Sequence, residues 1–205
     1  MIARNIVLFC LALGTLLSTN GQEASAAQGA TAPGTYRDWN GDIDEVTILQ
    51  PFNAANYNAI AVESFDTAGI PLPNPSDNTF PAVQTALRLI KPAFMAGLEQ
   101  TARRKIGAIN LPGPKRNGGT LIIRARVTKL DPGSRAARYW GGFGAGAVKI
   151  AMIGEIIDGA SKKTLVRFKQ ERRSAMGVFG GGYDELFTRT ARQIGEDIAT
   201  LVNAF

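Results

Sequence analysis

The sequence predicts an α+β fold, a two-layer sandwich in which a mainly antiparallel sheet carries both helices on one face. Two amphipathic helices are expected, and three apolar segments separated by turn residues lie between them. The order strand, helix, three-strand meander, helix lets both helices cover the same face of the sheet. A composition of 45% hydrophobic and 20% charged residues is typical of a globular domain.

The first 26 residues have the three parts of a secretory signal peptide. Arg4 provides a basic start, Ile6–Leu17 is an apolar run, and Ala24-Ser25-Ala26 offers a small-residue cleavage site. The run is about 12 residues long, short of the roughly 20 that span a bilayer. Cys10, the only cysteine, lies inside the apolar run and follows Phe9. The cysteine of a lipoprotein would instead follow the run and a small residue. A cleaved signal peptide is therefore expected, and a lipid anchor is not. We therefore expect a periplasmic or secreted protein.

Three regions follow from this division of the chain. Residues 1–26 are the signal peptide, residues 27–45 are expected to be a flexible leader rich in Gly, Ala, Asn and Asp, and residues 46–205 form a single domain. Within the domain, Val46–Leu49 predicts a short strand and Ala59–Phe65 a better one, followed by a proline-rich loop.

The first helix has a clear start signal. Asp77 or Thr79 can cap it, and Pro81 falls in its first turn. Pro92 is expected to kink the helix or divide it in two, and Gly107 is a plausible stop. The apolar stripe at helical spacing consists of Val83, Leu87, Ile90, Phe94, Leu98, Ala102 and Ile106.

Three strands and a closing helix complete the predicted fold. Thr120–Leu130 alternates between apolar and polar residues, Ala147–Ile157 is more continuously apolar, and Thr164–Arg173 alternates again. Asp158-Gly159 between the last two is a strong hairpin signal. The final helix begins near Tyr183, and its stripe consists of Phe187, Ala191, Ile194, Ile198 and Leu201.

The residue types that are missing exclude several kinds of chemistry. The sequence contains no His, and its one Cys belongs to the signal peptide, so a Cys nucleophile, a His base and a Cys/His zinc site are excluded from the mature chain. The glycines of residues 131–146 lack the spacing and the following helix of a phosphate-binding loop. We expect no catalytic residue, no cofactor and no metal. A hydrolase that uses Asp or Glu remains an alternative.

The charges are distributed unevenly along the chain. Residues 27–87 contain seven acidic residues and one basic residue, whereas residues 88–173 contain 19 basic and 5 acidic residues. A basic block can attract anionic lipid or an anionic polymer. Binding of such a surface through a basic face and the Gly-rich loops is therefore an alternative to binding a protein partner. A nucleic-acid partner is not expected.

Two Gly-rich connections are expected to converge at one edge of the sheet. The first, Asp131–Gly146, joins the first two long strands, and the second, Gly177–Gly182, leads from the third strand to the last helix. Because the third strand runs antiparallel to the second, both connections lie at the same edge. Exposed aromatic and Arg side chains are typical of contact hot spots, although these aromatics could instead cap the core. The candidate interaction residues are Arg135, Arg138, Tyr139, Trp140, Phe143, Arg172, Arg173, Phe179 and Tyr183.

The second half of the chain resembles a known family. The segments RARVTKLDPGSRAARYWGGFGAGAVKI and EIIDGASKKTLVRF, followed by the Gly177–Gly182 cluster and a closing helix, are similar to the bacterial envelope family catalogued as domain of unknown function 4410. The resemblance covers about Tyr57–Phe205. It implies an exported or lipid-anchored envelope protein without established catalytic residues. We therefore expect a non-catalytic interaction or accessory module with an envelope protein as its partner.

Overall fold

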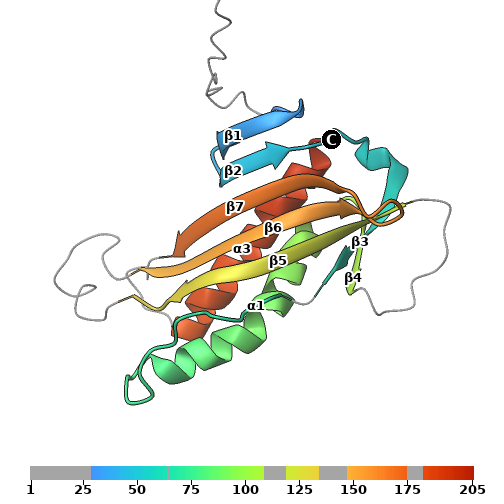
Figure 1. Ribbon diagram of the computed structural model, residues 1–205. Helices are drawn as coiled ribbons and strands as arrows, with labels where there is room; N and C mark the ends of the chain where they lie inside the picture. Colours follow the sequence, from blue (N-terminus) through green and yellow to red (C-terminus); the bar gives the residue numbers. More distant parts are fainter. Residues whose placement is uncertain (1–28, 64, 109–118, 134–146, 175–181) are drawn as a thin grey trace, which may run out of the picture.

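A computed structural model describes residues 29–63, 65–108, 119–133, 147–174 and 182–205 (Figure 1). These residues form a mixed α+β domain, as the sequence predicts. The elements in chain order are β1 (Gly34–Trp39), β2 (Ile43–Ile48), the 3₁₀ helix η1 (Ala54–Asn56), β3 (Tyr57–Val62), α1 (Phe80–Thr101), β4 (Lys105–Ala108), β5 (Gly119–Asp131), β6 (Val148–Asp158), β7 (Thr164–Ser174) and α3 (Tyr183–Asn203).

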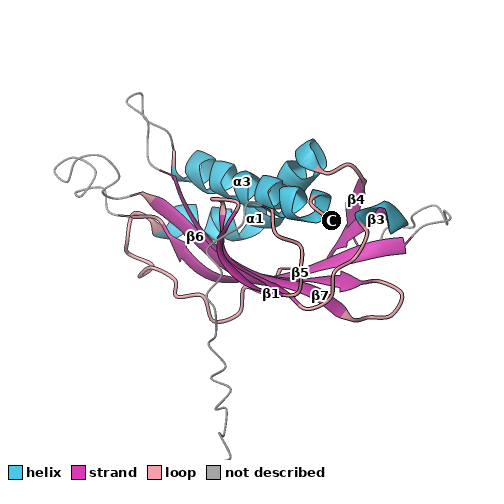
Figure 2. Ribbon diagram, turned by 90° about the horizontal axis from the view of Figure 1, so that it is seen from above, coloured by secondary structure: helices cyan, strands magenta, loops and turns pink. Residues whose placement is uncertain are grey.

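The strands form one seven-stranded sheet in the order β1-β2-β7-β6-β5-β3-β4. β5, β6 and β7 pair in chain order, each antiparallel to the next, and β7 is antiparallel to β2. β3 is parallel to both of its neighbours, β4 and β5, so the sheet is mixed but mostly antiparallel. Helices α1 and α3 lie on the same side of the sheet (Figure 2). We call the opposite side the open face.

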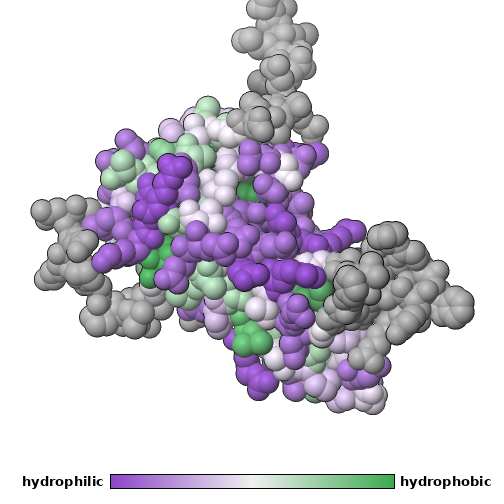
Figure 3. All heavy atoms as spheres, turned by 180° about the vertical axis from the view of Figure 1, so that it is seen from behind, coloured by the Kyte–Doolittle hydropathy of each residue, from purple (hydrophilic) through white to green (hydrophobic). Residues whose placement is uncertain are grey.

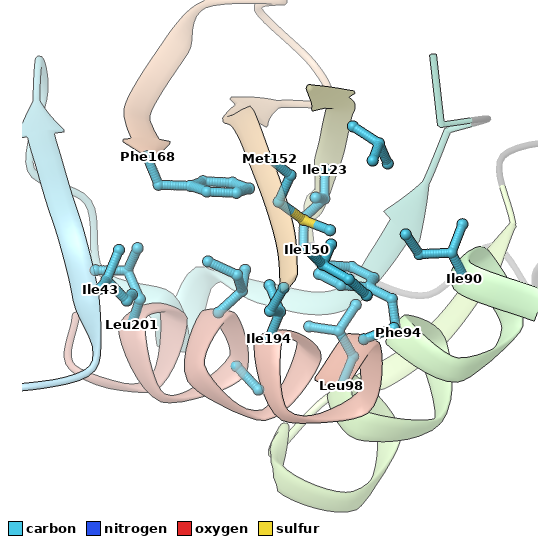
Figure 4. Packing of buried hydrophobic residues seen from close by; sticks show 14 of the residues in the cluster. Ile43, Ile90, Phe94, Leu98, Ile123, Ile150, Met152, Phe168, Ile194 and Leu201 are labelled. Atoms are coloured by element: carbon cyan, nitrogen blue, oxygen red, sulfur yellow. The ribbon is translucent and has the colours of Figure 1, made fainter. Parts of the chain in front are cut away.

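The core fills the space between the helices and the sheet. Phe94 and Leu98 of α1 and Ile194 of α3 point toward Ile150 and Met152 of β6 (Figure 4). All five side chains have no exposed surface. These positions follow from the pattern of the sequence, because alternate strand residues and one stripe of each helix face the same layer.

The two helices cross in direct backbone contact. A Cβ atom on Gly195 would overlap the carbonyl oxygen of Phe94 and lie 3.0 Å from the amide nitrogen of Leu98. A Cβ atom on Gly97 would likewise overlap the carbonyl oxygen of Arg192. Glycine at both positions thus lets the helices approach closely enough for their apolar stripes to share one core.

The expected flexible leader over residues 27–45 is wrong from Gly34 onward, because β1 and the first half of β2 lie in this stretch. Asn40, Gly41 and Asp42 form the three-residue turn of a hairpin, in which Asn40 and Gly41 have φ values of 57° and 77°. Trp39 is 1% exposed, and its Nε1 donates to the Ala30 carbonyl oxygen at 3.0 Å. Burial of this aromatic side chain stabilises the hairpin on the edge of the sheet.

Helix α1 differs from the expectation at its C-terminal end. It runs without interruption across Pro92, so the helix is not divided there. It ends at Thr101, and the expected continuation of the stripe to Ile106 is wrong. Ala102 is extended, and Ile106 pairs with Ile60 in a parallel ladder. A β-branched residue beside a strand gains more from this pairing than from another helical turn.

Candidate functional site

The described strands bring both long connections to one end of the sheet. Asp131 of β5 pairs with Lys149 of β6, which pairs with Arg173 of β7, and Val148 pairs with Ser174. Helix α3 begins at the same end (Figure 1). We call this region the loop end and define it as residues 128–133 of β5 and its continuation, 147–149, 173–174 and 182–183.

Three of the candidate residues lie in the described part of the chain. Arg172 faces α3 and is engaged inside the fold, where its Nε and Nη2 donate to the two carboxylate oxygens of Asp197 at 2.7 and 2.8 Å. Its Nη2 also donates to Asp42 Oδ1 at 3.0 Å. Arg173 points to the open face with 65% of its side chain exposed, and Tyr183 is buried at 7%. Of the three, Arg173 is the most exposed.

The other candidate residues lie outside the described residues, and their role in contact with a partner stays a prediction. They are Arg135, Arg138, Tyr139, Trp140, Phe143 and Phe179.

A buried polar network holds the N-terminal hairpin to the final helix. Gln170 has no exposed surface, and its Nε2 donates to the Asp42 carbonyl oxygen at 3.1 Å and to the carboxylate of Asp197. Burial raises the pKa of Asp197, while the hydrogen bonds from Arg172 and Gln170 act in the opposite direction. The network joins β7, α3 and the β1–β2 turn. The sequence predicts Arg172 to be a contact residue, since nothing in the sequence pairs this arginine with an acid 25 residues later.

A cluster of five charges lies on the open face at the loop end. Lys129 Nζ lies 3.9 Å from Asp131 Oδ2 and 3.9 Å from Glu171 Oε2. Lys149 Nζ approaches the same Asp131 oxygen at 3.8 Å, and Arg173 Nη2 lies 2.8 Å from Glu171 Oε1. Three cations therefore share two carboxylates, and the cluster keeps one excess positive charge.

A groove at the edge of β5 borders this cluster. It has a volume of about 260 Å³ and lies between Pro71–Pro73 on one side and Lys129–Pro132 on the other. Leu72 is 50% exposed in its wall. The sequence predicts a loop for the proline-rich segment and indicates no role for it. A sequence feature that could have indicated the groove is the apolar residue between two prolines. Prolines are disfavoured within a sheet, so such a residue can stay exposed beside a strand without pairing with it.

A second hollow runs along the first turns of α3 and has a volume of about 370 Å³. It is lined by polar and charged side chains of the outer helix surface, Asp184, Glu185, Thr188, Arg189 and Arg192. The side of the molecule that carries the helices is largely hydrophilic (Figure 3). This polarity agrees with helices that bury one stripe and leave the other in water.

In the described part of the chain, seven residues of the basic block, all on β5, β6 or β7, form ion pairs with acids. Arg124 Nε lies 2.5 Å from Glu63 Oε2, and Arg126 Nε lies 2.5 Å from Asp66 Oδ2, so acids from the N-terminal third neutralise bases of β5. Arg167 on the open face pairs with a glutamate of β6 at 3.1 Å. The open face thus carries alternating charges. This arrangement does not favour the alternative in which a basic face binds an anionic polymer or lipid.

None of the described helices is long and apolar enough to cross a bilayer. Among the same residues, no group of three or more acidic side chains is arranged to hold a metal ion.

Comparison with known proteins identifies the family. The fold is a mixed α+β domain in which the β5–β6 and β7–α3 connections begin at one end of the sheet. The model of the family described as domain of unknown function (DUF4410) matches residues 60–178, more than half of the chain. The chain belongs to this family, and the resemblance found in its second half is confirmed. No curated protein matches the chain.

Solved structures include distant matches. The PelC dodecamer from Paraburkholderia phytofirmans is 12% identical, with a TM-score of 0.41, and the match covers 74% of this chain and 96% of that chain. A Xanthomonas campestris protein of the family DUF330 is 13% identical, with a TM-score of 0.40, and the match covers 75% of this chain and 90% of that chain.

Proposed function

We propose that this protein is an exported, non-catalytic module of the bacterial cell envelope that binds a protein partner through its loop end. The observation that carries the proposal is the strand register. Asp131, Lys149 and Arg173 lie side by side on adjacent strands, so both long connections start from one rigid platform. Contact residues on loops that a rigid scaffold positions are a common arrangement for binding.

The residue types of the two connections support a contact role. The segment between β5 and β6 contains Arg138 and Trp140, which belong to the residue types that most often dominate the energy of protein contacts. A hairpin needs two to five residues to turn the chain, whereas this connection has roughly fifteen, a length that is often functional. Two described side chains at the same end of the molecule, Arg173 and Leu72, are also exposed and can contribute to the contact surface.

Export is supported by the N-terminal segment and by the position where the fold begins. The carbonyl oxygen of Ala30 accepts from the Trp39 indole, and that of Ala32 accepts from the Tyr36 hydroxyl at 3.0 Å. Cleavage after Ala26 would remove the apolar run and leave every one of these contacts in place. The mature protein would then start only a few residues before its first edge strand.

A non-catalytic role is supported by what the described carboxylates do. Asp158 accepts hydrogen bonds from the Tyr57 hydroxyl and from backbone amides of its own turn, and Asp197 is neutralised by Arg172. These groups stabilise turns and join elements. A catalytic pair would instead need carboxylates that converge on a substrate pocket.

The test is recovery of the partner from the native envelope with full-length variants. We expect the double variant Arg138→Ala with Trp140→Ala to lose the partner while its melting temperature changes little. The matched control is Arg167→Ala, an exposed arginine on the open face away from the loop end, which should keep the partner. If the double variant melts much lower and the folded fraction still binds, these side chains stabilise the core and the proposal is wrong. Binding that disappears at high salt in every variant would point to a charged surface instead.

A further inference from the structure

Among the described residues, none forms a backbone hydrogen bond with the last residues of β5 on the side away from β6. Asp66 is joined to β5 by two backbone hydrogen bonds. The Asp66 amide donates to the Ala125 carbonyl oxygen at 3.0 Å, and the Val127 amide donates to the Asp66 carbonyl oxygen at 2.9 Å. Beyond Val127, no backbone hydrogen bond joins the described part of β5 to the segment after Asp66. β5 nevertheless continues to Asp131, paired with β6 on its other side. Residues 128–131 therefore present an edge that a further strand can use.

The composition of the neighbouring segment explains why it leaves this edge free. Gly69, at a φ of 78°, turns the chain, and Pro71, Pro73 and Pro75 follow at alternate positions. Proline has no amide hydrogen, so these residues cannot donate to a strand beside them. The segment runs next to β5 without pairing with it, and the groove of about 260 Å³ lies between them.

The groove combines an apolar wall with a basic rim. Leu72 stands 50% exposed in the wall between two prolines, and Pro132 closes the opposite side. Lys129 lies at the rim and approaches Asp131 and Glu171 only at 3.9 Å. Lys129 can therefore form a closer ion pair with an additional carboxylate, because the cluster has one excess positive charge.

We propose that this groove binds a short extended segment of the protein partner, which adds a strand to the free edge of β5. An apolar side chain of the segment packs on Leu72, and a neighbouring carboxylate pairs with Lys129. In strand addition, main-chain hydrogen bonds supply affinity, and pockets for alternate side chains supply specificity. The inference rests on the proposed function, because the groove belongs to the loop end, and it adds the chemistry of the partner.

The test uses the mature protein with amide chemical shifts as the readout. The probes are three synthetic peptides: one that alternates leucine and glutamate, one that has lysine in place of glutamate, and one acidic peptide with methylated alternate backbone nitrogens. We expect the first to shift the amides of residues 128–131 and of Leu72 in a saturable way. The lysine peptide and the methylated peptide should each bind at least about tenfold more weakly.

Matched variants locate the site. Leu72→Asp should weaken binding of the acidic peptide at least about tenfold, since it removes the apolar contact and adds repulsion. Leu89→Asp, at a leucine on α1 that is 39% exposed, is the control and should bind as the unmodified protein does. Asp131→Asn should tighten binding, because Asp131 competes with the peptide for Lys129.

Three results would overturn the inference: equal binding of the acidic and lysine peptides, shifts confined to other parts of the molecule, or no saturable shift at millimolar peptide. The proposed function fails separately. If the peptides do not bind but Arg138→Ala with Trp140→Ala still abolishes partner recovery, the loop end is the contact surface and the groove is not part of it.

Discussion

Replacing Gly195 with alanine tests how the two helices pack. The new methyl group would overlap the carbonyl oxygen of Phe94 and lie 3.0 Å from the amide nitrogen of Leu98. Both atoms belong to the backbone of α1, so no side chain can rotate away, and the helices must separate. Overpacking of this kind costs about 3 kcal/mol, at the upper end of the usual range. Alanine recovers about 1 kcal/mol in helix propensity, so the net loss is about 2 kcal/mol.

The assay is thermal and urea unfolding of residues 27–205, monitored by circular dichroism. A loss of about 2 kcal/mol should lower the melting temperature by about 4–8 °C in a domain of this size. Gly97→Ala should behave similarly, since its methyl group would overlap the Arg192 carbonyl oxygen. The double variant should lose less than the sum, because one separation of the helices accommodates both methyl groups.

The matched control is Gly107→Ala in β4. A Cβ atom at this position meets no heavy atom within 4 Å, and the φ angle is not in the left-handed region. The control should be as stable as the unmodified domain or slightly more stable, because alanine restricts the unfolded chain. If Gly195→Ala is as stable as Gly107→Ala, the close helix crossing is wrong.

Further predictions concern a hydrogen bond and the sheet faces. The Tyr57 hydroxyl donates to Asp158 Oδ2 at 2.7 Å and, with backbone amides, lowers the pKa of Asp158 to about 2. This carboxylate therefore stabilises the fold above pH 3.8, and the contribution is lost as the pH falls through 2. Burial and the same bond raise the pKa of Tyr57 to about 12, so its contribution is present below pH 10 and is lost as the pH rises through 12. Tyr57→Phe should lower the free energy of unfolding by about 1–2 kcal/mol at pH 7 and weaken its dependence on pH on both the acid and the alkaline side. Urea unfolding as a function of pH measures this, and an unchanged dependence on the acid side would refute the hydrogen bond to Asp158. Val166→Asp and Ile194→Asp, each at a fully buried site, should prevent folding. Lys169→Ala on the open face should change the melting temperature by little. An equal loss of stability in all three variants would show that the faces of the sheet are assigned wrongly.

Most of the fold could be predicted from long segments with a regular pattern of apolar residues. β5, β6, β7 and α3 lie within one or two residues of the expected ranges, because their alternation or helical spacing extends over more than ten residues. The Asp158-Gly159 signal also marked the hairpin between β6 and β7 correctly. These elements determine the antiparallel centre of the sheet and the end at which the β5–β6 and β7–α3 connections begin.

Short elements were missed where local signals were weak or misjudged. The β1–β2 hairpin was hidden in a stretch rich in small polar residues, although Asn40-Gly41 is the strongest short hairpin signal. β4 was assigned to the helix because Ile106 continues the stripe by one turn. Its pairing with Ile60, 46 positions earlier, is a tertiary interaction that helical periodicity does not reveal.

The candidate site was predictable in position but not in detail. The strand order placed the connections at one edge, but the partner of Arg172 depends on how α3 lies over β7. The uneven charge of the sequence suggested a basic surface. In the structure, the acid-rich N-terminal region is the neighbour of the base-rich strands, and Glu63 pairs with Arg124. Charge along a chain therefore predicts the charge of a surface only once the pairing of distant segments is known.

The most direct test of the loop end as the contact surface is site-specific photo-crosslinking in the intact envelope. Benzoylphenylalanine replaces Arg173 in one strain and Lys169 in another, two exposed residues on the same face of β7, of which only Arg173 lies at the loop end. We predict that the Arg173 position crosslinks to a single protein partner and that the Lys169 position does not. A crosslink of equal yield at both positions, or one at Lys169 alone, would contradict the account.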